Sequence, residues 1–272
     1  MDVKYRKIIY KIPGLHSLCR RIVDIQNVMF YKKFVSFTHH DEILKSMKGV
    51  CKDRRCFIVG NGPSLTMEDL RLIKDEDCFA ANLIFKIFDD TEWRPMYYFL
   101  QDRYADTGNV VDNLDVEKLF IGDYYWRTRG MTNPRAVCFH GKRGAKTGIP
   151  EFSSDISEYI VDHHTVTYSM IQCAVYMGYE EIYLIGMDHN FALTCDEKGN
   201  IIGDTKGRSH VFVDDNPQEV VANIVGMNKA YIAARDYARA NGIKIVNCTR
   251  GGKLEWFERD SLENVLSRTI CQ

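Results

Sequence analysis

The strongest constraint on the fold is a series of short apolar runs that recur from about residue 55 onward. Most are continuous stretches of aliphatic, aromatic or β-branched residues, which is typical of strands buried on both faces of a parallel sheet. The predicted strands are residues 56–59, 78–81, 96–100, 119–121, 136–139, 181–185 and 244–247. Because helical patterns separate these strands, we predict an α/β fold with a Rossmann-like, doubly wound, mostly parallel sheet.

Helix signals fill the gaps between the strands. A helix is predicted over residues 67–73 and another over about 223–240. Thr167 is expected to cap a third helix, whose apolar positions share one face and which ends at Gly178. Residues from about 190 to 217 follow no clear period, so we expect a long loop there, of the kind that often forms a lid over a site.

Composition sets the outer limits of the interpretation. With 272 residues, 45% of them hydrophobic, the chain can bury one sizeable core, so we predict a catalytic domain over 51–272 and an appendage over 1–50. A net charge of -1 excludes whole-chain attraction to nucleic acid. The nine cysteines are scattered without a C-x-x-C pair, which indicates buried thiols of a cytoplasmic protein. No run is long enough to span a membrane, and no signal peptide is recognisable.

The first fifty residues alternate basic and apolar side chains. Such a stretch favours peripheral contact of residues 1–35 with an anionic membrane face, or docking of a partner. A pair of helices packed on the core, with the basic face in solvent, is an equally good interpretation. An oligomer is compatible with each of these interpretations.

The glycine turn in the stretch FIVGNGPSL follows directly on the first predicted strand. Gly60 and Gly62 remove the side chains that would keep a phosphate from the backbone N–H groups, while Asn61 and Ser64 add donors next to a helix start. The turn is neither a P-loop nor a G-x-G-x-x-G fingerprint. It predicts a site for a nucleotide phosphate or sugar, the alternative being a tight turn without a ligand.

Polar residues follow several other predicted strands. Asn82 and Asp102 follow the second and third strands, and Asp188 and His189 follow the sixth. Because the carboxyl ends of parallel strands meet at one edge, where α/β sheets bind ligands, these residues are expected to lie near the glycine turn.

Four stretches together resemble a known family: VGNGPSL, AANLIF, TVTYSMIQCAVYMGYEEIYLIGMDHNF and NCTRGGKLEWF. They resemble the bacterial 6-hydroxymethylpterin diphosphokinase-like (MptE-like) family. They are also similar to the lipooligosaccharide sialyltransferases and the motility-associated-factor glycosyltransferases. The resemblance covers about residues 55–260 and leaves the first fifty outside. It implies a single-domain, GT-A-like variant of the predicted Rossmann-like fold.

The resemblance implies roles for individual residues. In the sialyltransferases the matching motifs surround a CMP-sugar, which implies nucleotide contacts for Gly60, Asn61, Gly62, Ser64, Asn82, Asp102, Thr167 and Ser169. Tyr168 departs from that pattern, because the sialyltransferases have serine there. Those enzymes also place a catalytic histidine after a variable lid. His210 is therefore the first candidate for the base, with Asp188 and His189 as further catalytic candidates.

The reaction implied is metal-independent transfer of a nonulosonic acid or Kdo-like sugar from a CMP-activated donor to a surface glycan or glycolipid, as in lipopolysaccharide biosynthesis. A histidine titrates in the range that a base near pH 7 requires. Arg208, Arg143 and Lys146 are candidates to stabilise the leaving phosphate, and no cofactor is required.

Two alternatives remain open. In a diphosphokinase that uses ATP and Mg²⁺, Asp102 and Asp188 would hold the metal. A non-catalytic nucleotide-binding protein would keep the turn without the chemistry. His163 and His164 are further histidines that could face the site, and Trp256 is either part of the core or a platform for the acceptor.

Overall fold

A single parallel sheet of eight strands forms the centre of the protein. The computed structural model describes residues 14–101, 107–145, 147–191, 193–195, 201–203, 210–211 and 222–268. The strand order is β12-β11-β8-β1-β2-β3-β4-β5, and every neighbouring pair is parallel. The strands are β1 (Arg55–Val59), β2 (Asp77–Ala81), β3 (Tyr97–Leu100), β4 (Lys118–Gly122), β5 (Ala136–Phe139), β8 (Glu181–Ile185), β11 (Lys244–Asn247) and β12 (Glu258–Arg259).

Alternate residues of the strands pack into two separate cores. In β1, Cys56 and Ile58 face one core, whereas Phe57 and Val59 face the other. The helices α3 (His40–Ser46), α6 (Val166–Met177) and α7 (Ile224–Ala240) supply the first core. The helices α4 (Met67–Leu72), α5 (Asp123–Arg129) and α8 (Leu262–Ser267) supply the second, with the 3-10 turns η1 (Ile84–Ile87) and η2 (Val111–Asn113). Burial on both faces explains the uninterrupted apolar runs.

The predicted fold class and all seven predicted strands are confirmed. The eighth strand, β12, was missed because its two residues, Glu258 and Arg259, are charged and carry no strand pattern. Helix α6 ends at Gly178 with φ of 97°, as predicted. Its cap is Thr165, however, whose side chain accepts a hydrogen bond from the N–H of Thr167, so the prediction of Thr167 as the cap was wrong by two residues.

The segment predicted as a loop between residues 190 and 217 contains two strands in its described parts. β9 (Leu193–Cys195) pairs antiparallel with β10 (Ile201–Gly203). Strands of three residues are too short to show a period of two, so no pattern in the sequence predicts them. A parallel pair of short strands, β6 (Gly141–Arg143) and β7 (Ile160–Asp162), lies outside the main sheet.

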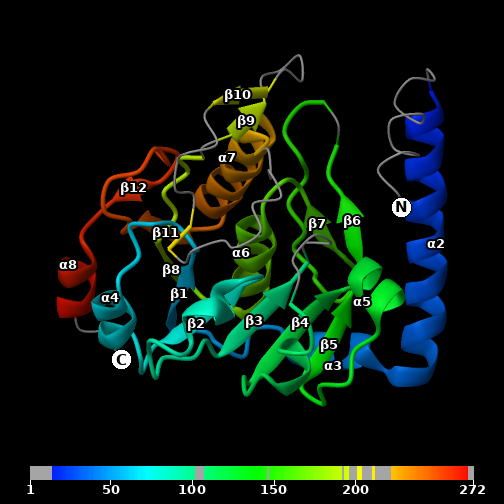
Figure 1. The fold of residues 1–272 in the computed structure, drawn as a ribbon, viewed down its shortest axis with the longest axis horizontal. Coiled ribbons are helices and arrows are strands. Elements are labelled where there is room, and N and C mark those ends of the chain that lie inside the picture. The colour runs from blue at the N-terminus through cyan, green and yellow to red at the C-terminus, as the bar shows by residue number, and fades with distance from the viewer. Residues whose placement is uncertain are drawn as a thin grey trace.

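The amino-terminal segment contains two helices, α2 (Leu15–Thr38) and α3. Figure 1 shows α2 at one edge of the molecule beside α5, with α8 at the opposite edge. The Nε–H of Arg127 in α5 donates to Oδ1 of Asn27 at 3.0 Å, and Arg143 forms an ion pair of 2.7 Å with Asp24. Residues 1–13 lie outside the described part, and none of the described helices has the length and apolar character needed to cross a membrane.

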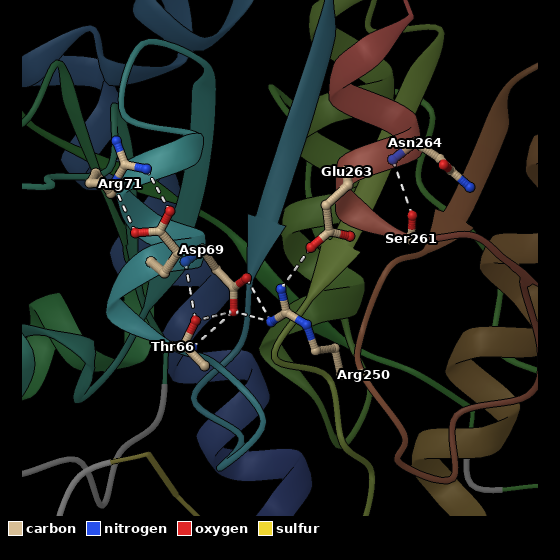
Figure 2. A network of polar contacts seen from close by, with 8 residues as sticks. Thr66, Asp69, Arg71, Arg250, Ser261, Glu263 and Asn264 are labelled. Carbon is tan, nitrogen blue, oxygen red and sulfur yellow. Dashed lines mark hydrogen bonds and ion pairs between the residues drawn. The ribbon is translucent and has the colours of Figure 1, made fainter.

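A polar network fixes the helix that follows the glycine turn (Figure 2). The buried Asp69 accepts hydrogen bonds from the N–H and hydroxyl of Thr66, which caps α4. Arg250, which follows β11, donates to Asp69 at 2.7 Å and to Glu263 in α8 at 3.2 Å. This network links α4 to α8 across the second core. The start of α4, where the turn from β1 ends, is thereby held in place.

Candidate active site

A cavity of about 120 Å³ opens where the chain direction across the sheet reverses. From β1 the chain proceeds through β2 to β5 on one side, and it returns to place β8 and β11 on the other. Ligands in open α/β sheets bind at this point, beyond the carboxyl ends of the strands. The cavity is lined by residues from the glycine turn, the start of α6, the end of β8 and the segment at residue 210, including Gly60, Asn61, Thr167, Asp188, His189 and His210.

The two glycines of the turn are required by close packing against the end of β8. The N–H of Gly60 donates to the carbonyl of Ile185 at 2.8 Å, and the N–H of Gly62 donates to that of Gly186 at 2.9 Å. A Cβ atom on Gly62 would lie 1.9 Å from Oδ2 of Asp188. Both of these N–H groups already bind β8, and the predicted nucleotide contacts of Gly60 and Gly62, which line the cavity, stay predictions.

Asp188 has a clear structural partner in the same turn. Its Oδ2 accepts hydrogen bonds from the hydroxyl of Ser64 at 2.7 Å and from the N–H of Ser64 at 3.3 Å. The carboxylate thereby ties the end of β8 to the start of the segment that leads into α4. A catalytic role for Asp188 and a nucleotide contact for Ser64 stay predictions.

Asn61 lies between the two glycines and has an unused acceptor. Its Nδ2 donates to the carbonyl of Ala81 at 3.4 Å, while its Oδ1 is buried and has no hydrogen-bond partner among the described residues. An unpartnered buried acceptor costs about 1–3 kcal/mol, so such an atom beside a cavity indicates a place for a ligand donor or a water. The carbonyl of Asn61 also accepts the N–H of Val211 at 2.7 Å, which brings His210 to the cavity.

The start of α6 forms the wall opposite the turn. Thr165, Val166 and Thr167 line the cavity, and the partial positive charge of a helix start favours an anion there. Tyr168 and Ser169 are fully buried, and the hydroxyl of Tyr168 donates to the carbonyl of Glu151 at 2.6 Å. The expected contact of Thr167 fits this geometry, whereas Ser169 is not among the described lining residues.

The tautomer of His189 is fixed by Trp256 and by Asn228, a residue that the sequence did not single out. The Nε1–H of Trp256 can only donate, and it lies 2.8 Å from Oδ1 of Asn228. The same oxygen lies 2.8 Å from Nε2 of His189. Nε2 must therefore carry a proton, so in the neutral imidazole the lone pair is on Nδ1.

This Nδ1 of His189 is buried and has no hydrogen-bond partner among the described residues. The side chain is 9% exposed, and its ring packs edge-on against Phe191 and Tyr231. Burial lowers the pKa of His189 below its ordinary value, and the hydrogen bond to Asn228 partly opposes that effect. His189 is thus a neutral imidazole of fixed orientation near pH 7, and its catalytic role stays a prediction.

A second cavity of about 340 Å³ adjoins the first. His189, Asn190 and Phe191 line both cavities. The second cavity also has Asn228, Lys253, Glu255 and Trp256 in its wall. Hydrogen-bonding groups beside an indole are suited to a polar ligand with an apolar face. Trp256 is partly buried against the first core as well, which fits the core interpretation, and its role as an acceptor platform stays a prediction.

The remaining predicted site residues lie apart from the cavity or outside the described residues. Asn82 takes a left-handed φ of 56° after β2, and Ala81, not Asn82, is among the described lining residues. Arg143 lines a different pocket and is paired with Asp24, so the expectation that it faces the leaving phosphate is wrong. Asp102, Lys146 and Arg208 lie outside the described residues.

His163 and His164 precede α6 and lie edge-on to each other, with ring centroids 4.7 Å apart. Neither is among the described residues that line the two cavities. Burial, with smaller contributions from His164 and Lys229, lowers the pKa of His163 to about 4. The folded protein therefore disfavours the charged form of His163, which makes the free energy of unfolding depend on pH.

We predict that the free energy of unfolding falls as the pH drops from 6.5 towards 4. The unfolded chain binds a proton at His163 more tightly than the folded chain, so acid favours unfolding. The contribution is complete above pH 6.5 and amounts to at most about 3 kcal/mol. The free energy of unfolding is measured by urea denaturation at several pH values between 4 and 7. It should change less steeply with pH in His163→Gln than in the parent, whereas an equal dependence on pH would contradict the assignment.

No group of three or more His, Cys, Asp or Glu side chains within the described ranges is arranged to hold a metal ion. Because Asp102 lies outside these ranges, the metal independence of the reaction stays a prediction. The seven cysteines that the structure characterises are free thiols, and all except Cys19 are buried, in agreement with the sequence.

Residues 26–193 match the family described as 6-hydroxymethylpterin diphosphokinase MptE-like. This match spans more than half of the chain. The chain belongs to the MptE-like family. The predicted membership is confirmed, but the match begins inside α2, so the expectation that the first fifty residues lie outside the resemblance is corrected.

This MptE-like chain is similar in fold to a glycosyltransferase of known structure. A solved structure of the MAf glycosyltransferase from Magnetospirillum magneticum AMB-1 is 16% identical in sequence, with a TM-score of 0.49. The likeness covers 86% of this chain and 39% of that one, so this chain spans less than half of its length. No curated protein matches the sequence.

Proposed function

We propose that this MptE-like protein is a glycosyltransferase of the sialyltransferase-like type. It moves a nonulosonic acid or Kdo-like sugar from a CMP-activated donor to a surface glycan or glycolipid. The observation that carries the proposal is the position of His189, a neutral and oriented base in the wall shared by two adjoining cavities. Transfer between two substrates needs such an arrangement, because the base must reach the acceptor hydroxyl while the donor is bound beside it.

The donor nucleotide occupies the smaller cavity in this proposal. Its phosphate lies at the start of α6, near Thr165 and Thr167, where the partial charge of the helix opposes the charge of the leaving group. Oδ1 of Asn61 accepts a hydrogen bond from the donor, which satisfies the unpartnered oxygen.

The acceptor occupies the larger cavity, beside Trp256. Nδ1 of His189 takes the proton of the acceptor hydroxyl while the hydroxyl oxygen attacks the anomeric carbon of the donor sugar. The bond between that carbon and the phosphate oxygen breaks, and CMP leaves with the bonding electrons. His210 lines the donor cavity and is the second candidate for the base.

Thermal unfolding in the presence of nucleotides tests the donor class. CMP, CDP, UDP, GDP and ATP are compared, each with Mg²⁺ and with EDTA. CMP is expected to raise Tm in EDTA, because a ligand at about 100 times its Kd adds roughly 2.7 kcal/mol to the free energy of unfolding. Asn61→Ala should reduce the shift, whereas Asn113→Ala, an exposed residue on η2, should leave it unchanged.

The competing function makes the opposite prediction in the same experiment. The family description favours diphosphate transfer from ATP, which requires Mg²⁺ between the phosphates. A Tm shift with ATP that disappears in EDTA, with none from CMP, would overturn the glycosyltransferase proposal. Binding of CMP without turnover of any CMP-sugar by the parent protein would favour the non-catalytic alternative.

A further inference from the structure

Helix α2 presents an apolar stripe to solvent. Five of the ten exposed large hydrophobic residues of the described chain lie on this one helix, with exposed fractions between 46% and 75%. They are Leu18, Ile22, Ile25, Met29 and Phe37. Isolated exposed apolar residues need no explanation, but a concentration on one element marks an interaction surface.

The stripe lies on the side of α2 that points away from the protein. At about 100° per residue, Leu18, Ile22, Ile25 and Met29 fall within a narrow arc and form the stripe, whereas Phe37 lies outside that arc. Asn27 and Tyr31 on the opposite side are buried, and Asn27 accepts the hydrogen bond from Arg127 of α5. In Figure 1 no other described element lies beyond α2 at this edge of the molecule.

Basic side chains flank the stripe. Arg21, Lys32 and Lys33 are exposed and fall on its two sides on the same helical projection. The one acidic residue in α2, Asp24, lies on the inner side and is neutralised by Arg143. The outer face of the helix is therefore apolar in the middle, positive at the flanks and free of acidic residues from α2 itself.

From this arrangement we propose that α2 lies flat on an anionic lipid surface, with its stripe of Leu18, Ile22, Ile25 and Met29 in the interface. Anionic headgroups match the basic flanks, and each nearby Lys or Arg strengthens binding to such a surface. The helix is about 36 Å long at 1.5 Å per residue, so the contact extends along one whole edge of the molecule. This proposal does not depend on the transfer reaction.

A second copy of the chain fits the same face less well. The spacing of the four apolar residues follows a heptad seam, but the next two seam positions are Lys32 and Ser36. Two heptads are shorter than the three or four that a coiled coil normally sustains. The absence of acidic residues on the outer face of α2 also leaves the basic flanks without partners in such a pair.

Co-sedimentation of the full chain with vesicles tests the proposal. Vesicles of phosphatidylcholine containing about one third phosphatidylglycerol are compared with pure phosphatidylcholine, since the basic flanks respond to surface charge. The parent is expected to bind the anionic vesicles, and to bind them less as salt rises from about 0.1 M to about 0.5 M. Arg21→Gln, Lys32→Gln and Lys33→Gln together should weaken binding by more than about ten-fold.

The contribution of the apolar stripe of α2 to vesicle binding can be tested with a matched control. The triple variant Ile22→Ser, Ile25→Ser and Met29→Ser should lose binding. Val50→Ser, Val110→Ser and Ile149→Ser together change equally exposed apolar residues outside α2 and should bind like the parent. Thermal unfolding of each variant confirms that it is folded.

Two outcomes would overturn the proposal. One is a parent protein that stays in the supernatant with both vesicle types. The other is a concentration-dependent dimer in sedimentation velocity that the α2 triple variant abolishes, together with no vesicle binding, which would assign the stripe to a second copy.

Discussion

Replacing His189 by glutamine is expected to lower kcat for sugar transfer by about 10²- to 10⁴-fold, the range that a positioned general base contributes. Glutamine retains a donor that can reach Asn228 but has no nitrogen lone pair to take a proton. The protein should still bind CMP, because the groups proposed to hold the phosphate lie at the start of α6. Single-turnover kinetics with a CMP-sugar, alongside the Tm shift with CMP, measure both effects.

His210→Gln is the comparison that decides between the two histidines. If His210 is the base, the large loss will follow His210→Gln, and His189→Gln will change the rate by only a small factor. Equal and modest losses in both variants would contradict a histidine base at this site.

The link through Asn228 adds a readout that a purely structural role would not change. Aspartate at position 228 keeps an oxygen for both Trp256 and His189 but places a negative charge beside the imidazole. This raises the pKa of His189, whose neutral form is the active one. The acid limb of the kcat/KM profile should therefore move to higher pH in Asn228→Asp, whereas an unmoved limb would exclude His189 as the titrating base.

Replacing Gly62 by alanine is expected to destabilise the protein and to remove nucleotide binding. The added Cβ would lie 1.9 Å from Oδ2 of Asp188 and 2.6 Å from the carbonyl oxygen of Gly186. The aspartate side chain can move away, but the backbone carbonyl of Gly186 is held by the N–H of Gly62. Forcing extra volume into such a contact costs about 1–3 kcal/mol, and we expect the upper end here.

Gly122→Ala is the matched control for Gly62→Ala. Gly122 also ends a strand of the sheet, but its Cβ would lie 3.6 Å from the nearest atom, a ring carbon of Phe139, which is an ordinary contact. Urea denaturation and the Tm shift with CMP are measured for both variants. A Gly62→Ala protein with the stability of the Gly122→Ala protein and full nucleotide binding would contradict the packing described between β1 and β8.

The sequence by itself determined the strands of the sheet and the place where a site should lie. Strand formation in β1 or β8 is a local property, because a run such as FIV or EIYLI is apolar on both faces. The Gly-Asn-Gly turn after β1 and the Met-Asp-His segment after β8 were therefore assigned to one edge of the sheet. Short or charged elements such as β12 and the β9–β10 pair carry too few residues for a pattern.

Only the tertiary structure decided what each polar group at that edge does. Gly62 is needed because Asp188, 126 positions later, packs over it. The N–H groups of Gly60 and Gly62 donate to the end of β8. The His189 ring is held in one tautomer because Asn228, 39 residues away along the chain, bridges it to Trp256. Hydrogen-bond partners of this kind are set by which elements converge in space, and no local pattern in the sequence records that convergence.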